Sequence, residues 1–383
     1  MSDESFDVLI VGAGIVGLTQ ALASAEQRWR VAVIDRVKLT AECRDDFDSR
    51  VYAINHESQT LWTRLGVWPL LSRKTPYRQM QVWDQLGGGE IRFFAEEIAK
   101  TALGHIIEDH VIKAALIQKL KDYPNVHVFT EEKLTSLVPT EKGISLIGSR
   151  LFHAPLLIGA DGAQSWVREQ VGIALDAQPC GQTALVCTVR TEKPHENAAR
   201  QAFTPTGPVA LLPLFDPHTT SLVWSADSDY ADTLLQMNDD DFSQALTTIF
   251  SDKLGRVVHV SARHPFVLTQ RQAKAYVAPN VALIGDAAHT LHPLAGLGMN
   301  LGLGDVALLT EILGAPCQPS LSRLQRYETE RKGESAALLA TMRGLQQLFG
   351  GQNRSKAALR SFGLQLAHHF TPLKRFFMHQ AGA

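Results

Sequence analysis

Residues 281–305 decide the fold, and they read VALIGDAAHTLHPLAGLGMNLGLGD. The first four residues form an apolar run typical of a buried strand, and this run ends at Gly285 and Asp286. A loop with one proline and two glycines follows, and the apolar periodicity of residues 300–313 predicts a helix. Such a loop presents backbone N–H groups and a positive helix N-terminus, which suit an anion or an electron-rich ring.

A second glycine loop lies near the start of the chain. Residues 6–11 are almost all apolar, as in a buried parallel strand, and GAGIVG follows at residues 12–17. In such a loop the first glycine permits a tight turn, the second lets backbone approach a pyrophosphate, and the third lets helix pack on strand. The next predicted strand, residues 31–34, ends at Asp35, close to the distance of about 20 residues expected for a ribose-binding carboxylate. This order predicts a dinucleotide-binding unit rather than a chance glycine-rich turn.

Composition excludes several classes of protein. A length of 383 residues predicts two domains, or one large domain with a helical tail, and 45% hydrophobic and 20% charged residues are ordinary for a globular enzyme. A net charge of −2 gives no electrostatic case for nucleic-acid binding. The four cysteines are widely spaced, which argues against a zinc site or a disulfide framework and favours a reducing cytoplasm. We expect neither a signal peptide nor an apolar run of the roughly 18 residues needed to span a bilayer.

Between and after the two loops, the patterns predict alternating strands and helices. Residues 156–162 form a further buried-strand pattern, which ends in Asp161-Gly162. The middle of the chain is mostly strand, with one helix expected over residues 239–250. The other expected elements are helices over 57–65, 105–121, 321–349 and 356–370, strands over 80–84, 91–95 and 126–129, and a hairpin over 134–146.

Three motifs in this order resemble the fingerprints of the class A flavoprotein aromatic hydroxylases. They are the glycine loop at 12–17, Ala160-Asp161-Gly162, and Gly285-Asp286-Ala287-Ala288-His289. The wider match is closest to the ring hydroxylases of ubiquinone biosynthesis, and it includes Asp48-Ser49-Arg50 and residues 103–108, 207–214 and 285–305. The resemblance implies an α/β fold with an α+β insert. This is a Rossmann-like GR2 FAD-binding fold with an inserted, mostly antiparallel β-sheet substrate domain and C-terminal helices.

The resemblance also implies where FAD binds. The first loop would hold the pyrophosphate, the acid after the second strand the adenosine ribose, and the Gly-Asp motif the ribityl chain. Backbone near residues 298–300 would meet the isoalloxazine, and the Asp-Gly motif is associated with both FAD and NAD(P)H. Arg50 is read either as pointing toward a phosphate or flavin edge or as an ordinary surface arginine. The implied cofactor-binding residues are Gly12, Gly14, Ile15, Val16, Gly17, Asp35, Arg36, Arg50, Asp161, Gly285, Asp286, Pro293, Gly296, Gly298, Met299 and Asn300.

Two positions depart from the family pattern. Many relatives carry Gln at the position of Leu297 and a larger polar residue at the position of Gly304. If backbone amides hold the flavin, Leu297 changes little, whereas a role for the Gln side chain would alter rate or specificity. His289 and His292 flank the flavin loop and either help to deprotonate a phenol or bond to loop backbone, so the catalytic base stays unassigned.

The resemblance implies a monooxygenase that uses FAD, NAD(P)H and O₂ to hydroxylate a polyprenylated phenol on the path to ubiquinone. No metal-ligand cluster stands out in the sequence, so no metal is expected and the cofactor carries the hard chemistry. The expected domains are residues 1–174 and 271–315 for FAD, with strands of the substrate-side sheet near 80–95, residues 175–270 for substrate, and residues 316–383 as a helical region. The expected location is the cytoplasm, and peripheral contact with the inner membrane, a homo-oligomer and a ubiquinone-biosynthesis complex stay open.

Three rival functions remain at this point. A plain NAD-dependent dehydrogenase explains the first loop but neither Asp161-Gly162 nor Gly285-Asp286. Another flavin enzyme, such as an epoxidase or a reductase acting on a different hydrophobic substrate, shares the FAD loops. A non-catalytic flavin-binding member of a biosynthetic complex is compatible with the departures at Leu297 and Gly304.

Overall fold

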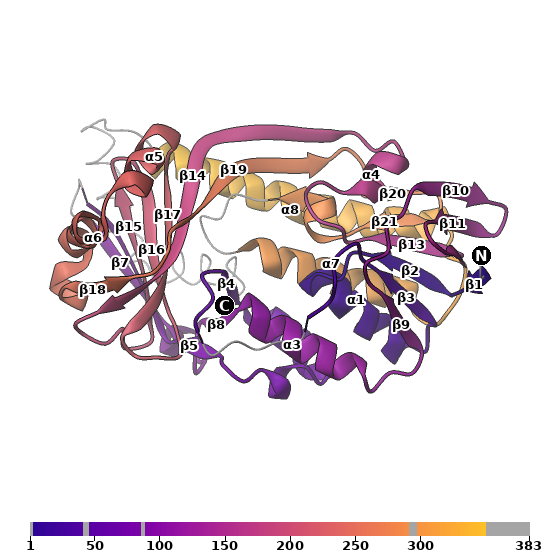
Figure 1. Ribbon diagram of the computed structural model, residues 1–383, viewed down its shortest axis with the longest axis horizontal. Helices are drawn as coiled ribbons and strands as arrows, with labels where there is room; N and C mark the ends of the chain where they lie inside the picture. Colours follow the sequence, from indigo (N-terminus) through magenta and orange to yellow (C-terminus); the bar gives the residue numbers. More distant parts are fainter. Residues whose placement is uncertain (1–2, 41–45, 86–88, 291–296, 350–383) are drawn as a thin grey trace.

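The computed structural model describes residues 3–40, 46–85, 89–290 and 297–349 (Figure 1). Its first main unit is a six-stranded sheet in the order β20-β21-β13-β2-β3-β9, parallel except for β20. Apolar runs without alternation form four of these strands because both faces of the sheet are covered. The strands are β2 (Val8–Val11), β3 (Val31–Ile34), β9 (Val126–Phe129), β13 (Leu156–Gly159), β20 (Val277–Ala278) and β21 (Val281–Leu283).

Three helices pack around this sheet in one hydrophobic core. They are α1 (Ile15–Glu26), α3 (Asp109–Leu120) and α7 (Leu297–Leu313), and α1 contacts both of the others. A shorter helix, α4 (Trp166–Gln170), follows β13. Helix α8 (Leu321–Phe349) packs on α7 and confirms the helix expected over 321–349. The helix expected over 356–370 lies outside the described residues.

Two small sheets flank the main one. One contains β1 (Asp3–Ser5), β12 (Leu151–Ala154), β11 (Gly143–Ile147) and β10 (Ser136–Thr140). The other contains β4 (Val51–Ile54), β8 (Gly104–Glu108) and β5 (Thr75–Tyr77), with α2 (His56–Arg64) following β4. Here the prediction of a helix starting at residue 105 was wrong. Residues 104–108 pair with β4 and β5 instead, and the helix begins only at Asp109.

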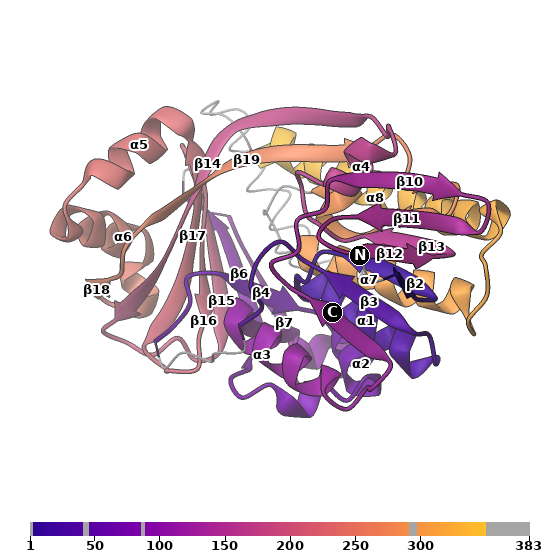
Figure 2. The same cartoon turned by 45° about the vertical axis from the view of Figure 1, so that its right-hand side comes forward.

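The second main unit is a nine-stranded sheet that is antiparallel except where β15 meets β6. Helices α5 (Ser228–Gln236) and α6 (Asp239–Leu254) cover its outer face (Figure 2). The sequence predicted only the second of these helices. The strands are β6 (Gln79–Asp84), β7 (Glu90–Phe94), β14 (Leu175–Thr191), β15 (Ala198–Thr204), β16 (Gly207–Pro213), β17 (Thr219–Asp227), β18 (Val257–Val260), β19 (His264–Ala273) and β22 (His289–Thr290).

Two long strands join the units. β14 and β19 pair along most of their length and run from the nine-stranded sheet across to the six-stranded sheet (Figure 1). Their pairing is interrupted between Pro179 and Thr183, where Gly181 adopts a positive φ of 67°. The molecule is therefore a mixed α/β protein, as the sequence predicted. Among the described helices, none is long and apolar enough to cross a membrane.

Candidate functional site

All three sequence motifs follow neighbouring parallel strands of the six-stranded sheet. The glycine loop follows β2, the Asp-Gly motif follows β13 and the Gly-Asp motif follows β21, and these strands are adjacent in the order β21-β13-β2. Parallel strands end at the same edge of a sheet, so segments separated by about 120 residues or more meet there. This edge is where open α/β sheets bind their ligands.

The three glycines of the first loop have different surroundings. A Cβ atom on Gly12, whose φ is 108°, would lie 2.3 Å from the carbonyl oxygen of Ala160, and one on Gly17 would lie 1.9 Å from that of Gly12. A Cβ atom on Gly14 would meet no described atom within 4 Å. Gly14 is also the N-cap of α1, where no side chain bonds the first N–H groups. The fold therefore requires Gly12 and Gly17, whereas Gly14 leaves open space at a helix N-terminus.

Asp35 lies directly against this loop. Its Oδ2 accepts a hydrogen bond of 2.6 Å from the backbone N–H of Ala13, and its Oδ1 accepts one of 2.8 Å from that of Val37. The carboxylate keeps further lone pairs for hydroxyl donors, since each oxygen can accept more than one bond. The neighbouring Arg36 is exposed.

The first loop also contacts the Gly-Asp loop. Val16 packs on Gly285, whose hypothetical Cβ atom would lie 3.3 Å from the Val16 side chain, and on Gly302 of α7, where that distance is 2.9 Å. Gly285 has a φ of 60°, which a glycine adopts readily. Ile15, the neighbour of Val16, is buried in the core. The two loops thus fix each other through small residues.

The Asp-Gly motif is satisfied within its own loop. Asp161 Oδ1 accepts a bond of 2.5 Å from the Ser165 hydroxyl, and Oδ2 accepts one of 3.0 Å from the Val167 N–H. The carboxylate thereby shapes the turn into α4. Buried Arg168 then donates from Nη1 to the carbonyl oxygen of Ala287, at 3.0 Å, and so ties this loop to the Gly-Asp loop.

Asp286 is exposed at the same edge, directly after Gly285. Desolvation by neighbouring atoms raises the pKa of its carboxyl, and the charges of Arg50 and Arg271 act in the opposite direction. The side chain still has accessible surface, so a ligand can reach it. Arg50 is 61% exposed, lies over the ring of Tyr52 and is 4.0 Å from Asp109. The structure thus places Arg50 on the surface of the site, within electrostatic reach of Asp286.

Asp305 on helix α7 stabilises the Gly-Asp loop through hydrogen bonds. It has no exposed surface, and its Oδ2 accepts bonds from the Gly285 N–H at 2.8 Å and from His289 Nε2 at 2.7 Å. Its Oδ1 accepts a bond of 2.6 Å from Nε of Arg331 on α8. His289 is itself buried and bonded to this carboxylate rather than only to loop backbone. His292 lies outside the described residues.

The start of α7 contains the remaining predicted residues. Asn300 Oδ1 accepts bonds from the Asn55 N–H and the Ser58 hydroxyl, and its Nδ2 donates to the Ala53 carbonyl, so the side chain anchors α7 to α2. Met299 packs against the core, and a Cβ atom on Gly298 would meet no described atom within 4 Å. Pro293 and Gly296 lie outside the described residues.

Comparison with known proteins identifies the family. Residues 5–341 match the model of a family described as an FAD binding domain. The chain is 37% identical to a ubiquinone hydroxylase of Rhodospirillum rubrum, over 99% of this chain and 90% of that one. It is 34% identical to the 3-demethoxyubiquinol 3-hydroxylase of Escherichia coli, over 98% of both, and 32% identical to the human mitochondrial ubiquinone biosynthesis monooxygenase, over 98% and 92%. The chain belongs to the FAD-dependent monooxygenase family. The predicted class of FAD-dependent aromatic-ring hydroxylase is thereby confirmed.

Solved structures agree on the fold of this FAD-dependent monooxygenase. p-Nitrophenol 4-monooxygenase of Pseudomonas putida superposes with a TM-score of 0.81 at 18% identity, over 99% of both chains. Anhydrotetracycline hydroxylase of Streptomyces rimosus superposes with a TM-score of 0.73 at 21% identity, over 99% of this chain and 76% of that one. At these identities the likeness shows the fold alone.

The residues at the strand ends fit FAD. Gly14 and Gly298 lie at or near helix N-termini and leave open space, which suits a pyrophosphate and a ring that backbone N–H groups bind. Asp35 and Asp286 offer carboxylates to hydroxyls on either side of that space. When bound, FAD supplies the redox and oxygen chemistry, and the protein supplies binding, orientation and exclusion of water.

The nine-stranded sheet presents an inner face toward these loops. Leu185 and Cys187 of β14 lie in the core beneath α5 and α6, so strand alternation places Val186 on the opposite face. Val223 of β17 is paired with Val186 and shares that face. Both valines are half-buried, and this face looks toward the six-stranded sheet (Figure 1). The same alternation places Thr188 and Ser221 on this face, so it offers apolar surface beside hydroxyl groups.

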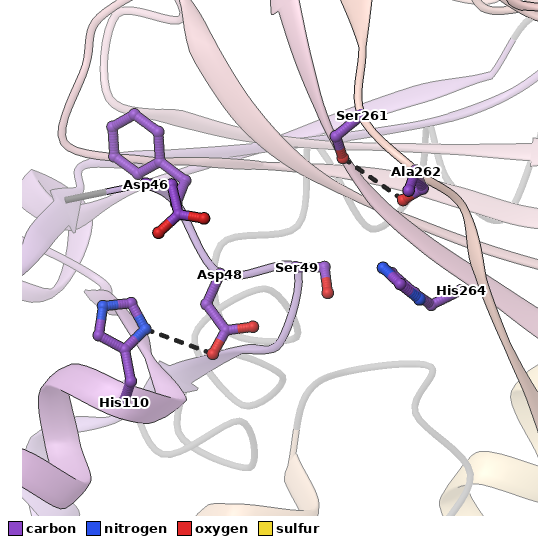
Figure 3. Close-up of a pocket in the computed structure, with 8 residues that line it drawn as sticks. Asp46, Asp48, Ser49, His110, Ser261, Ala262 and His264 are labelled. Atoms are coloured by element: carbon purple, nitrogen blue, oxygen red, sulfur yellow. Dashed lines mark hydrogen bonds and ion pairs between the residues drawn. The ribbon is translucent and has the colours of Figure 1, made fainter. Parts of the chain in front are cut away.

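A polar pocket of about 230 Å³ lies where the two units meet (Figure 3). Its Asp48 Oδ2 is 3.3 Å from Nδ1 of His110, whose Nε2 is 2.7 Å from Nη2 of Arg73. A guanidinium can only donate, so His110 Nε2 accepts and Nδ1 carries the proton. Within the described ranges, no group of three or more His, Cys, Asp or Glu residues could hold a metal ion. The lining residues are Asp46, Phe47, Asp48, Ser49, His110, Ser261, Ala262 and His264.

The sequence did not identify three of the groups that shape the site. Asp305, Arg331 and Arg168 are all nearly or fully buried and bond to segments far along the chain. One signal was available for Asp305. It is an acid among apolar and small residues of a helical pattern, and such an acid requires a partner when it is buried.

Proposed function

We propose that this FAD-dependent monooxygenase uses NAD(P)H and O₂ to hydroxylate the ring of a polyprenylated phenol in ubiquinone biosynthesis. The observation that carries the proposal is the meeting of three cofactor-type loops at one sheet edge, which the inner face of the nine-stranded sheet looks toward. Near full-length relatives named as ubiquinone hydroxylases and ubiquinone biosynthesis monooxygenases support the substrate class. No residue is proposed as the catalytic base.

We further propose the roles of the predicted residues and segments. Gly14 lets backbone approach the pyrophosphate, while Gly12 and Gly17 allow the turn and the helix packing that form the loop. Asp35 binds the ribose, and Asp286 binds the ribityl chain. Residues 1–174 and 271–315 form the FAD-binding part, residues 175–270 the substrate part and residues 316–383 a helical region. The side chains of Asp161 and Asn300 also shape their loops, because both bond within the protein.

A prenylated substrate partitions into bilayers, so the enzyme must meet it at a membrane surface or receive it from a partner. Prenyl groups add apolar burial worth roughly 25 cal/mol for each Å² removed from water. The half-buried Val186 and Val223 of the inner sheet face offer such surface. We therefore propose a cytoplasmic enzyme in peripheral contact with the inner membrane or with a ubiquinone-biosynthesis complex.

The test compares phenols that differ only in their tail. NADPH oxidation and product formation are measured by absorbance and mass spectrometry for a simple phenol and for the same phenol with prenyl chains of increasing length. We expect each prenyl unit to lower KM and to raise the fraction of NADPH oxidation that ends in hydroxylation. Efficient turnover of p-hydroxybenzoate with no turnover of prenylated phenols would contradict the ubiquinone assignment but leave the hydroxylase class intact.

A further inference from the structure

Arg331 is a buried arginine on α8 that reaches the Gly-Asp loop only through Asp305. Arg331 is 4% exposed, and its Nε lies 2.6 Å from Oδ1 of Asp305, which has no exposed surface. Two charges removed from water cost more than they return unless their geometry is good and their remaining atoms are bonded. Arg331 meets that condition, because Nη2 donates to the carbonyl oxygen of Leu301 at 2.9 Å and Nη1 forms an ion pair with Glu334.

The space for this guanidinium comes from a missing side chain. A Cβ atom on Gly304 would lie 3.0 Å from Nη2 and 3.2 Å from Nη1 of Arg331. In this chain the absent side chain lets the guanidinium lie close against α7 and reach Asp305 and Leu301.

The other oxygen of Asp305 faces the cofactor loop. Oδ2 accepts bonds from the Gly285 N–H and from His289 Nε2, and Gly285 adopts the positive φ that starts the turn ending in Asp286. We propose that Arg331 is a positioning residue that, through Asp305, keeps the Gly285–Asp286 turn in its FAD-binding geometry as the pH falls. This inference rests on the proposed role of that turn in binding FAD.

The sign of the pH effect follows from the charges around Asp305. Burial acts to raise the pKa of Asp305, but the contacts with His289 and Arg331 outweigh it and hold the pKa below the ordinary value. Asp286 on the loop, Tyr276 before β20, and Tyr327 and Glu334 on α8 are the other titratable groups that interact with this pair. A lowered pKa keeps the stabilisation present above the ordinary value and loses it only as the pH falls through the lowered one.

Without the arginine, the effect of burial is opposed only by His289 and by the Gly285 N–H. Asp305 then takes up a proton at a higher pH, and its neutral carboxyl binds the Gly285 N–H more weakly. Loss of a charge-assisted bond corresponds to a roughly 10- to 100-fold change in an equilibrium constant. The turn should therefore lose its FAD-binding geometry in mildly acidic solution, where the wild-type protein keeps it.

The experiment titrates apoprotein with FAD between pH 8 and pH 5.5 and follows flavin fluorescence. We expect Arg331→Met to bind FAD roughly 10- to 100-fold more weakly at the acidic end than at pH 8, beyond any change in wild type, and Arg331→Lys to recover part of the difference. The matched control is Arg323→Met on the same helix, because Arg323 donates to Ile312 and Leu313 at the other end of α7. It should lower Tm without making FAD affinity depend more strongly on pH.

Two results would overturn the inference. One is an Arg331→Met protein whose FAD affinity follows the wild-type pH profile, and the other is an Arg323→Met protein that shows the same acid sensitivity. If Arg331→Met does not fold, Arg331→Gln carries the test, because it also removes the charge, and a wild-type profile in that variant contradicts the proposal. Normal FAD binding without phenol hydroxylation would refute the proposed substrate and leave this inference standing.

Discussion

Asp286 lies in the Gly-Asp loop and Asp305 lies on helix α7, and their surroundings give them different roles. Asp286 is exposed at the sheet edge, so its carboxylate can accept a hydrogen bond from a ligand hydroxyl. Asp305 has no exposed surface, and three protein donors occupy its oxygens. At the scale of single residues, accessibility therefore separates the group proposed to bind the cofactor from the one that holds the loop.

Replacing Asp286 tests the first of these roles. Asp286→Ala removes one charge-assisted hydrogen bond to the ribityl chain, worth about 1.5–3 kcal/mol. FAD affinity measured by titration of the apoprotein should fall roughly 10- to 150-fold. Asp286→Asn keeps the shape and one acceptor, so it should lose less. Unchanged FAD affinity in Asp286→Ala would remove this residue from the proposed site.

His105 should make the free energy of unfolding depend on pH, independently of FAD. Its ring packs edge-on against Trp68, and its buried Nδ1 has no hydrogen-bond partner among the described residues. Burial, with smaller contributions from His56 and Lys74, lowers the pKa of His105 to about 4. The unfolded chain binds this proton near its ordinary pKa of about 6.5, so the free energy of unfolding should decrease as the pH falls from about 6.5 to 4.

The measurement is an NMR titration of His105 together with urea unfolding at several pH values. The resonance should titrate with a midpoint near 4. The variant His105→Phe keeps an aromatic ring against Trp68 and should lose stability less steeply over the same pH range. A midpoint near 6.5 in the folded protein would show that the ring is hydrated and would contradict this account.

Sequence could predict residues whose role depends on neighbours along the chain. Gly12, Gly14, Gly17 and Asp35 were predicted because loop and acid belong to one strand-loop-helix-strand unit, and the structure places Asp35 against Ala13. Arg331 could not be predicted, because its partner lies on another helix and its bond depends on the tertiary packing of the two. The cofactor contact of Asp161 stays a prediction, and the bonds that its oxygens accept within its own turn were not predicted.

At the scale of elements, the first glycine loop separates folding from binding within six residues. Gly12 and Gly17 have backbone atoms closer than 3.0 Å to a hypothetical Cβ, whereas Gly14 has nothing within 4 Å. A side chain at residue 14 should therefore leave the fold intact and prevent FAD from binding. The same loop provides its own control positions.

The prediction is that Gly14→Val folds but purifies without flavin, because its side chain fills the space in which backbone approaches the pyrophosphate. Gly17→Ala should instead lower Tm of the apoprotein, since its Cβ would lie 1.9 Å from the Gly12 carbonyl oxygen. Thermal unfolding and the ratio of flavin to protein absorbance measure both effects. A Gly14→Val protein with full flavin content would contradict the placement of the pyrophosphate.

Elements were predictable where a periodic pattern was long or a turn signal was strong. Helix α8 matches its expected range because 29 residues without an internal proline sustain the helical pattern. Residues 104–108 were misread because a short apolar run suits either state, and pairing with β4 and β5 decides it. Helix α5 was missed because only Ala231 and Leu234 of its nine residues are buried.

At the scale of the whole molecule, two paired strands determine how the substrate face meets the cofactor loops. β14 and β19 connect the units, and β22 of the Gly-Asp loop pairs with β19, so the nine-stranded sheet ends directly at that loop. The α/β class and the inserted sheet could be anticipated from motif order and resemblance. The parallel pairing of β6 with β15 could not, because it joins residues more than 110 positions apart.

The most direct test of the central claim follows oxygen from O₂ into the product. Purified protein with bound FAD is supplied with NADPH, a prenylated phenol and ¹⁸O₂, and the product ring is analysed by mass spectrometry. An FAD-dependent monooxygenase inserts one atom of O₂, so each hydroxylated ring should contain one ¹⁸O and its formation should require FAD. Product oxygen derived from water, or NADPH oxidation that yields only hydrogen peroxide with every prenylated phenol, would contradict the account.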